Sequence, residues 1–279
     1  MLELYNKISE KTSKLITNSY STSFSIGIRL LHKSLRQPIY QIYGFVRIAD
    51  EIVDTFHNFD KEKLLSDFKI ETFKAINEHI STNPVLNSFQ SVVHKYNIDT
   101  ELIETFFYSM NLDLTKRTYI YEEFKQYIRG SAEAVGLMCL KVFVKGDIIE
   151  YNRLMPYAAA LGSAFQKVNF LRDIKADYYK LGRVYFPQLN IDLRDKTSKK
   201  AIEDDIEKDF DTALKGINLL PRTAKLGVLV AYNYYLSLFK KIKKMDFSTL
   251  LRKRPRVPDF IKYLILLKTF VILKFAFKK

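Results

Sequence analysis

The chain has 279 residues and a formal charge of +14, and 47 % of its residues are hydrophobic, which is ample material for a packed core. Its single cysteine, Cys139, excludes an intramolecular disulfide framework and fits a reducing compartment. Residues 1–20 contain no apolar stretch of the length that a signal peptide needs, so we expect a cytoplasmic protein.

Helical periodicity runs through the chain, and no segment shows a convincing strand-like alternation. Glycine and proline, with 9 and 7 residues, are scarce enough to leave long helices uninterrupted. We therefore expect one all-α domain over residues 1–279, without internal repeats or linkers. The expected helices cover residues 3–17, 21–30, 35–56, 61–80, 84–95, 99–110, 121–144, 147–177, 198–217, 220–245 and 257–277.

The helix expected over residues 35–56 contains the stretch YGFVRIADEIVD, in which Arg47, Asp50 and Asp54 share one side. Two carboxylates one helical turn apart repel each other, so such a pair within an apolar helix suggests a compensating cation. An Asp-x3-Asp pair is a weak signal by itself, and surface salt bridging is the plain alternative.

A second polar stripe lies in the helix expected over residues 147–177. The stretch QKVNFLRDIKAD spaces its polar side chains by three or four residues, which puts them on one helix face: Gln166, Asn169, Asp173 and Asp177. Like the first pair, these two aspartates have an apolar surround and a neighbouring arginine, here Arg172. This context favours a metal–phosphate site over surface salt bridges.

Mg²⁺ is the natural cation for two such faces, because this hard ion takes oxygen ligands and often shares them with substrate phosphates. The histidines are scattered and Cys139 is alone, so nothing favours a softer metal. A third pair, Asp205 and Asp209, lies in the acidic run EDDIEKDFD, and we interpret it as a solvated surface. Two facing carboxylate pairs in an aromatic, apolar setting indicate ionisation of an allylic prenyl diphosphate.

The positive charge is concentrated in residues 240–279, which hold thirteen Lys or Arg against Asp246 and Asp259. The absence of zinc-finger spacing, RNA-binding aromatics and zipper heptads argues against nucleic acid. Lysines interrupt the apolar residues of the basic C-terminal helix expected near 257–277, so it falls short of a spanning segment. We expect peripheral contact with the inner face of the cell membrane, with packing onto the core or a solvated tail as alternatives.

Four motifs, in order between about residue 15 and residue 187, resemble those of the squalene and phytoene synthases, and the bacterial phytoene synthases most of all. YSTSFSIGIRLL is similar to the N-terminal substrate segment of that family, and YGFVRIADEIVD to its first aspartate motif. YIRGSAEAVG resembles the family's central helix, and QKVNFLRDIKADYYKLGRVYFP its second aspartate motif. The resemblance implies a helical bundle of the isoprenoid-synthase type that encloses a central apolar cavity.

The same resemblance implies roles for individual residues. It implies that the catalytic metal ligands are Asp50 and Asp54 on one side of the cavity. On the other side the implied ligands are Asp173, Asp177 and Asn169. It implies that the diphosphate is bound by the catalytic residues Tyr43 and Arg47 and by Tyr20, Ser21, Thr22 and Ser23. The remaining substrate-binding positions are Phe24, Val135, Gly136, Gln166, Asn169, Arg183, Tyr185 and Tyr235. Asp113 resembles an acidic position of the family, with its role left open.

The implied activity is a Mg²⁺-dependent head-to-head condensation of two prenyl diphosphates through a cyclopropylcarbinyl diphosphate. We favour two geranylgeranyl diphosphates as substrates, giving phytoene in carotenoid biosynthesis. The alternative within the family is two farnesyl diphosphates, giving dehydrosqualene, or squalene with NADPH as reductant. The alternative from another class is a non-catalytic helical relative that docks on membranes. The oligomeric state stays open.

Overall fold

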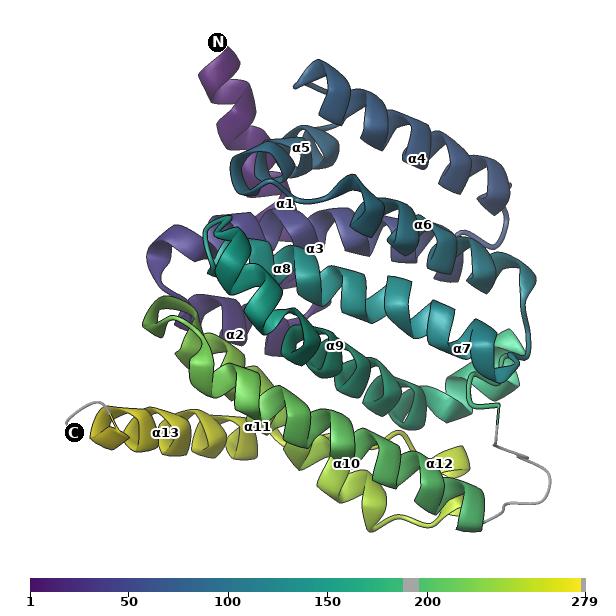
Figure 1. The fold of residues 1–279 in the computed structure, drawn as a ribbon. Coiled ribbons are helices and arrows are strands. Elements are labelled where there is room, and N and C mark those ends of the chain that lie inside the picture. The colour runs from purple at the N-terminus through teal and green to yellow at the C-terminus, as the bar shows by residue number, and fades with distance from the viewer. Residues whose placement is uncertain (188–195, 277–279) are drawn as a thin grey trace.

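The computed structural model describes residues 1–187 and 196–276, and over these residues the chain folds into one all-α domain, as predicted (Figure 1). Two single turns are π-helical, η1 (Arg129–Glu133) and η2 (Asp177–Leu181). The α-helices are α1 (Leu2–Tyr20), α2 (Thr22–Leu30), α3 (Lys33–Asp54), α4 (Lys61–Glu78), α5 (Pro84–Tyr96), α6 (Thr100–Thr115), α7 (Tyr121–Ile128), α8 (Ala134–Phe143), α9 (Ile148–Ala176), α10 (Lys196–Leu219), α11 (Arg222–Lys243), α12 (Phe247–Arg252) and α13 (Asp259–Ala276).

Local sequence sets where several helices begin. The Asn83 side chain accepts a hydrogen bond from the backbone N–H of Val85 at 3.0 Å, and Pro84 fills the first helical position of α5. Asp147 caps α9 in the same way, accepting from the backbone N–H of Ile149 at 2.9 Å. These caps satisfy backbone donors that the first helical turn leaves without intrahelical partners.

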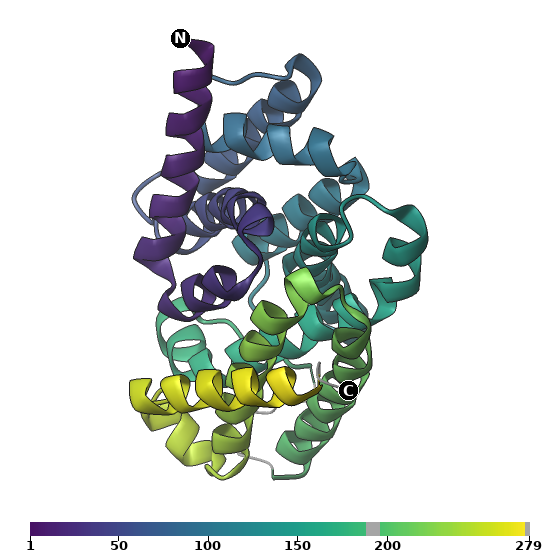
Figure 2. The same cartoon turned by 90° about the vertical axis from the view of Figure 1, so that its left-hand side faces the viewer.

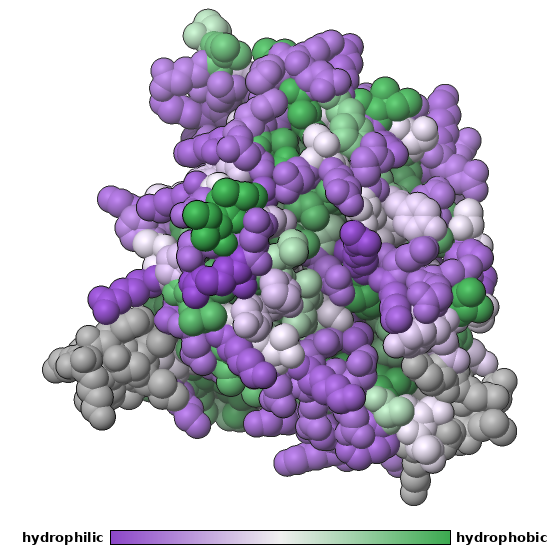
Figure 3. Space-filling model, in the orientation of Figure 1, coloured by the Kyte–Doolittle hydropathy of each residue, from purple (hydrophilic) through white to green (hydrophobic). Residues whose placement is uncertain are grey.

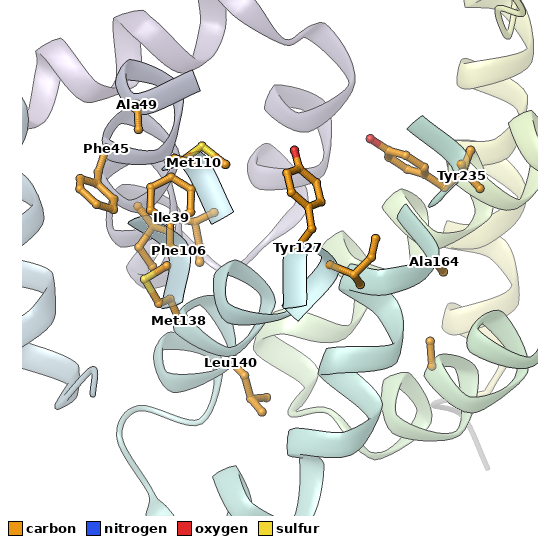
Figure 4. Close-up of a cluster of buried hydrophobic side chains, with 14 of the residues drawn as sticks. Ile39, Phe45, Ala49, Phe106, Met110, Tyr127, Met138, Leu140, Ala164 and Tyr235 are labelled. Carbon is orange, nitrogen blue, oxygen red and sulfur yellow. The ribbon is translucent and has the colours of Figure 1, made fainter. Parts of the chain in front are cut away.

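The two long helices α3 and α9 carry the polar stripes and organise the bundle. Helix α3 packs against α1, α5 and α8, whereas α9 packs against α8, α10 and α11. In both ribbon views α1, α4 and α5 occupy the upper part of the molecule, and α10 to α13 the lower part (Figures 1 and 2). The core is aromatic in places: the rings of Phe45 and Phe89 stack with centroids 3.9 Å apart. Figure 4 shows Phe45 and Phe106 crowded together, with Tyr235 well apart from them.

The structure extends and interrupts some expected helices. Helix α6 continues past residue 110 to Thr115, so Asp113 lies on it. The helix expected over residues 121–144 contains η1, and the one expected over 147–177 continues through η2. Such π-helical turns occur frequently at functional sites. Helix α12 was not expected, because six residues are too few to show a periodic pattern.

One face of the molecule is largely polar. On the face shown in Figure 3, hydrophilic residues predominate and hydrophobic ones form small separate groups. Over the described ranges, none of the helices is both long and apolar enough to cross a bilayer.

Candidate functional site

A cavity of about 620 Å³ lies between α2, α3, α8, α9, α10 and α11. Along both α3 and α9, the residues that line it change from apolar near the start of the helix to polar near its end. The apolar part of the wall includes Ile28, Leu31, Ile39, Phe143, Leu154 and Leu220. The cavity therefore has one end suited to a charged group and one suited to hydrocarbon.

Both predicted polar stripes face this cavity. From α3 the wall receives Tyr43, Arg47, Asp50 and Asp54. From α9 and the start of η2 it receives Gln166, Asn169, Asp173 and Asp177. The helical spacing on which the two stripes were predicted is thus confirmed as one face of each helix.

Arg47 is held in place before any ligand arrives. One of its Nη atoms contacts the carboxylate of Glu51, and its Nη1 lies 3.8 Å from Asp50 Oδ2. The Tyr20 ring stacks under the guanidinium, with 4.3 Å between the guanidinium carbon and the ring centroid. Arg47 Nε is buried and has no hydrogen-bond partner among the described residues. Arg47 lines the cavity, and its Nη1 is beyond hydrogen-bond distance of Asp50, so this group can still donate to a ligand.

Among the four aspartates of the two stripes, Asp173 has the closest cationic partners. Its carboxylate accepts hydrogen bonds from Arg172, at 3.1 Å from Nε to each oxygen, and from Arg254 Nε at 2.5 Å. Burial opposes ionisation of Asp173, but the two arginines outweigh it and hold its pKa below the ordinary value. Arg254 comes from the basic segment before α13 and lines the cavity as well.

Asp50 and Asp177 lie in the opposite electrostatic situation. Burial, and after it the charge of Asp54, raises the pKa of Asp50 to about 7, with Arg47 opposing the change. Burial, followed by the charges of Asp173 and Asp54, raises the pKa of Asp177 to about 8. These carboxylates from both helices line the same cavity, so they repel one another across it. A divalent cation between them would relieve this repulsion.

The segment after η2 joins the two sides of the polar end. The backbone N–H of Val184 donates to Arg117 O at 2.8 Å, and Thr118 and Val184 form an isolated parallel bridge. This attachment brings Arg183 across to α3, where its Nη1 donates to Asp54 Oδ1 at 3.0 Å. Tyr185 follows and lines the cavity. These contacts attach Arg183 to Asp54 and place Tyr185 in the cavity wall.

Most of the predicted site residues gather in the cavity wall. Besides the residues of the two stripes, the wall contains seven of the predicted positions: Tyr20, Ser21, Phe24, Val135, Gly136, Tyr185 and Tyr235. Thr22 does not join them, since it is exposed on the first turn of α2, where helical spacing turns it away from Ser21 and Phe24. Arg183 lies behind the wall, buried between Asp54 and Asp113. The side chain of Ser23 is outside the described part of the structure.

Sequence reasoning missed several cavity residues, among them Arg254 and Phe165, and misjudged Asp209. The sequence shows Arg254 only as one of the basic residues near the C-terminus, within the run RKRPR at 252–256. In the fold this run lies beside α9, and Arg254 donates to Asp173. The interpretation of the acidic run as a solvated surface agrees with Asp205, whose side chain is 57 % exposed, but is wrong for Asp209, whose side chain is 21 % exposed. Both accept hydrogen bonds from Lys167 Nζ, at 2.5 and 2.8 Å, and the Lys167 side chain is buried between α9 and α10. A buried lysine needs carboxylate partners. Nothing in the sequence around Lys167 indicated that its side chain would be buried.

The donor set at the polar end fits a hard divalent cation. Carboxylate oxygens from both stripes and the Asn169 amide line the same end of the cavity. Over the residues that the structure describes, no three Asp, Glu, His or Cys side chains form a ready metal cage. Mg²⁺ is usually bound through one or two carboxylates together with waters and substrate phosphates.

Residues 17–260 match the model of the squalene/phytoene synthase family. The chain belongs to this family. It is accordingly a prenyltransferase of the head-to-head prenyl diphosphate synthase type, which confirms the predicted family and enzyme class.

Similar proteins carry related names. The 4,4'-diapophytoene synthase of Staphylococcus haemolyticus is 22 % identical over 273 residues, covering 90 % of this chain and 92 % of that protein. The phytoene synthase of Arthrospira platensis is 24 % identical over 283 residues, covering 90 % and 89 %. Among solved structures, a dehydrosqualene synthase in complex with a ligand superimposes with a TM-score of 0.84 at 19 % identity, covering 96 % of this chain and 98 % of that one. The last likeness confirms the fold.

Proposed function

We propose that this enzyme condenses two molecules of geranylgeranyl diphosphate to phytoene, with Mg²⁺, as a step of carotenoid biosynthesis. The observation that supports this function is the cavity, which gathers the carboxylates of α3 and α9 at one end and is otherwise apolar. A prenyl diphosphate has the same division of polarity along its length.

Departure of the first diphosphate is the step that the polar end assists. Arg47, oriented by Glu51 and Tyr20, donates N–H groups to the oxygens on which negative charge accumulates. The Tyr43 hydroxyl lines the wall one turn earlier and donates to the same group. When bound, Mg²⁺ supplies further positive charge to the leaving group. The residues that would hold it are Asp50, Asp54, Asn169, Asp173 and Asp177.

The middle of the cavity protects the allylic cation that this departure leaves. The rings of Phe165 and Tyr235 both line the wall and stack with centroids 3.9 Å apart, which offers a π face to positive charge. The Tyr235 hydroxyl donates to Asn169 Oδ1 at 3.3 Å, which fixes that ring. The apolar wall excludes the water that would quench the cation. The cation then adds across a double bond of the second prenyl chain and a proton passes to the released diphosphate, giving a cyclopropylcarbinyl diphosphate. Ionisation of that diphosphate, rearrangement and loss of a second proton give the linear product.

A second candidate is the condensation of two farnesyl diphosphates to dehydrosqualene, or to squalene with NADPH. The relative named 4,4'-diapophytoene synthase favours it, because the match covers nearly the whole of both chains. The non-catalytic alternative has less support, since all four motif aspartates and Arg47 line the cavity.

A product assay separates these candidates. Purified protein is incubated with Mg²⁺ and either farnesyl or geranylgeranyl diphosphate, with and without NADPH, and hydrocarbons are identified by mass. We expect a C40 product from the C20 substrate, and none from the Asp50→Asn variant. A C30 product alone would replace the first candidate by the second, with NADPH dependence marking squalene. No product from either substrate, with folded protein, would contradict both.

We also propose that the enzyme contacts an anionic membrane through α13, at the inner face of the cell membrane. One face of this helix carries large hydrophobic side chains that are 50–70 % exposed: Phe260, Tyr263, Leu264, Leu267 and Phe270. The opposite face packs on α11, where Asn233 donates to the hydroxyl of buried Thr269 at 2.9 Å. Figure 2 shows α13 lying across the outside of the bundle. An outward apolar face next to basic residues suits a helix lying in a lipid interface.

Vesicle sedimentation tests this contact. The wild type is expected to sediment with vesicles of phosphatidylglycerol and to bind phosphatidylcholine vesicles much less. The double variant Leu264→Ser/Leu267→Ser should lose most of this binding. A matched change of two exposed residues elsewhere, Ile148→Ser/Ile149→Ser, should not. Equal binding by all three proteins would refute the role of α13.

A further inference from the structure

Asp113, whose role the sequence left open, is the centre of a buried hydrogen-bond network beside the polar end of the cavity. Its carboxylate accepts hydrogen bonds from three tyrosine hydroxyls, two at Oδ1 and one at Oδ2. Tyr119 and Tyr185 donate to Oδ1 at 3.0 Å each, and Tyr127 donates to Oδ2 at 2.6 Å. The residue is only 5 % exposed. Burial raises the pKa of Asp113, but Arg183 and the tyrosine hydroxyls favour its ionised form.

One guanidinium connects this buried carboxylate to the cavity. Arg183 Nη2 donates to the backbone oxygen of Asp113 at 2.8 Å, and Nη1 lies 3.9 Å from Asp113 Oδ2. The same Nη1 donates to Asp54 Oδ1 at 3.0 Å and to the Tyr185 hydroxyl at 3.3 Å. Asp54 is 47 % exposed at the cavity wall, whereas the Arg183 side chain is 4 % exposed. The chain of contacts therefore runs from a buried anion, through a buried cation, to an anion in the site.

The network does more than hold the fold together. Buried ion pairs stabilise proteins little in comparison with apolar packing. Arg183 Nε is also buried without a hydrogen-bond partner among the described residues, which is a further cost to stability. What the arrangement does provide is a fixed Asp54 carboxylate, since Oδ1 is tied to a guanidinium that cannot move away from Asp113. Without the Asp113 carboxylate on its other side, the Arg183 guanidinium would neutralise the charge of Asp54.

We propose that Asp113 is a positioning residue: it anchors Arg183 and offsets its charge, so that Asp54 keeps both its orientation and its negative charge for a divalent cation. This inference rests on the proposed role of Asp54 as a metal ligand. It assigns Asp113 no contact with substrate. Groups that orient metal ligands from behind commonly affect metal affinity by about 10- to 100-fold, and that is the size of effect expected here.

Titration with Mn²⁺, followed by the electron paramagnetic resonance signal of the free ion, measures the affinity directly and without turnover. Asp113→Asn keeps the shape of the side chain but leaves Arg183 unbalanced beside Asp54. We expect it to weaken Mn²⁺ binding about 10- to 100-fold. Binding of inorganic pyrophosphate in EDTA, measured by calorimetry, should stay equal or become tighter, because the site gains positive charge. General structural damage would weaken both ligands.

Removing the arginine provides the decisive comparison. If Asp113 acts through Arg183, then Asp113→Asn introduced into an Arg183→Gln background should change Mn²⁺ affinity less than about threefold. The double variant should bind Mn²⁺ more tightly than Asp113→Asn alone, because the unbalanced cation is gone. Should Asp113→Asn alone not fold, the comparison of Arg183→Gln with the double variant still decides. Tyr119→Phe, which removes one hydroxyl but no charge, is the matched control and should bind Mn²⁺ like the wild type.

Two results would overturn the inference: unchanged Mn²⁺ affinity in Asp113→Asn, or a large further loss when that change is added to Arg183→Gln. Failure of the proposed metal site would look different. In that case the wild type itself would not bind Mn²⁺ at this end of the cavity, and Asp50→Asn would have no effect on binding.

Discussion

Replacing Asp177 by Asn is expected to stabilise the metal-free protein at alkaline pH while abolishing prenyl transfer. Burial and the charges of Asp173 and Asp54 raise the pKa of Asp177 to about 8 in the folded state, whereas an aspartate in an unfolded chain titrates near pH 4, roughly. The folded state thus holds this proton more tightly than the unfolded state does. The carboxyl therefore costs stability progressively as the pH rises from about 4 to about 8, and costs most above that range.

The difference between the two pKa values corresponds to an upper limit of about 6 kcal/mol. Solvent in the open cavity screens the charges, so we expect Asp177→Asn to recover about 2 kcal/mol at pH 8.5. For a domain of this size that raises Tm by about 4–8 °C. At pH 5.5 the folded carboxyl is protonated but the unfolded one is ionised, so about a third of the difference should remain, and it should vanish only below about pH 4.

Thermal unfolding followed by circular dichroism, in EDTA at both pH values, measures the two differences in Tm. The comparison at pH 5.5 corrects for any change in hydrogen bonding between the acid and the amide. A variant less stable than the wild type at pH 8.5, or one that gains equally at both pH values, would refute the electrostatic account. Addition of Mg²⁺ with pyrophosphate should reverse the order at pH 8.5, because the ligand stabilises the wild type alone.

Two further predictions concern the walls around the site. Asp209→Ala should lower the free energy of unfolding by about 2–3 kcal/mol, because it removes a carboxylate 2.8 Å from the buried Lys167 ammonium. Asp205→Ala should lower it by only about 1 kcal/mol, because the Asp205 side chain is exposed. Urea denaturation compares the two, and equal losses would contradict the buried pair. Gly216→Ala should slow turnover, since its Cβ would lie 2.1 Å from Tyr157 Cβ and force that ring into the cavity. Unchanged steady-state rates would show that the wall yields instead.

The sequence pattern predicted those features of the site that depend only on residues within one helix. The stripes of α3 and α9 could be read from spacing alone, because helical geometry puts residues three and four apart on one face. Arg254 and Asp113 could not be assigned in that way. Arg254 reaches Asp173 from the far end of the chain, and Asp113 acquires its tyrosine partners only when α6, α7 and the segment after η2 come together. The error at Asp209 has the same origin, because its partner Lys167 lies on another helix.

The distribution of arginines over the polar end explains why the site favours a cation. Asp54 has Arg183, Asp173 has Arg172 and Arg254, and Glu51 has Arg47. Asp50 has only the longer contact of 3.8 Å to Arg47, and among the described residues no cation forms an ion pair with Asp177. These are the two carboxyl groups whose pKa values rise to about 7 and about 8. The uncompensated charge therefore lies on one aspartate from each helix, so a divalent cation that bridges the helices neutralises both at once, and loss of either aspartate should remove its binding.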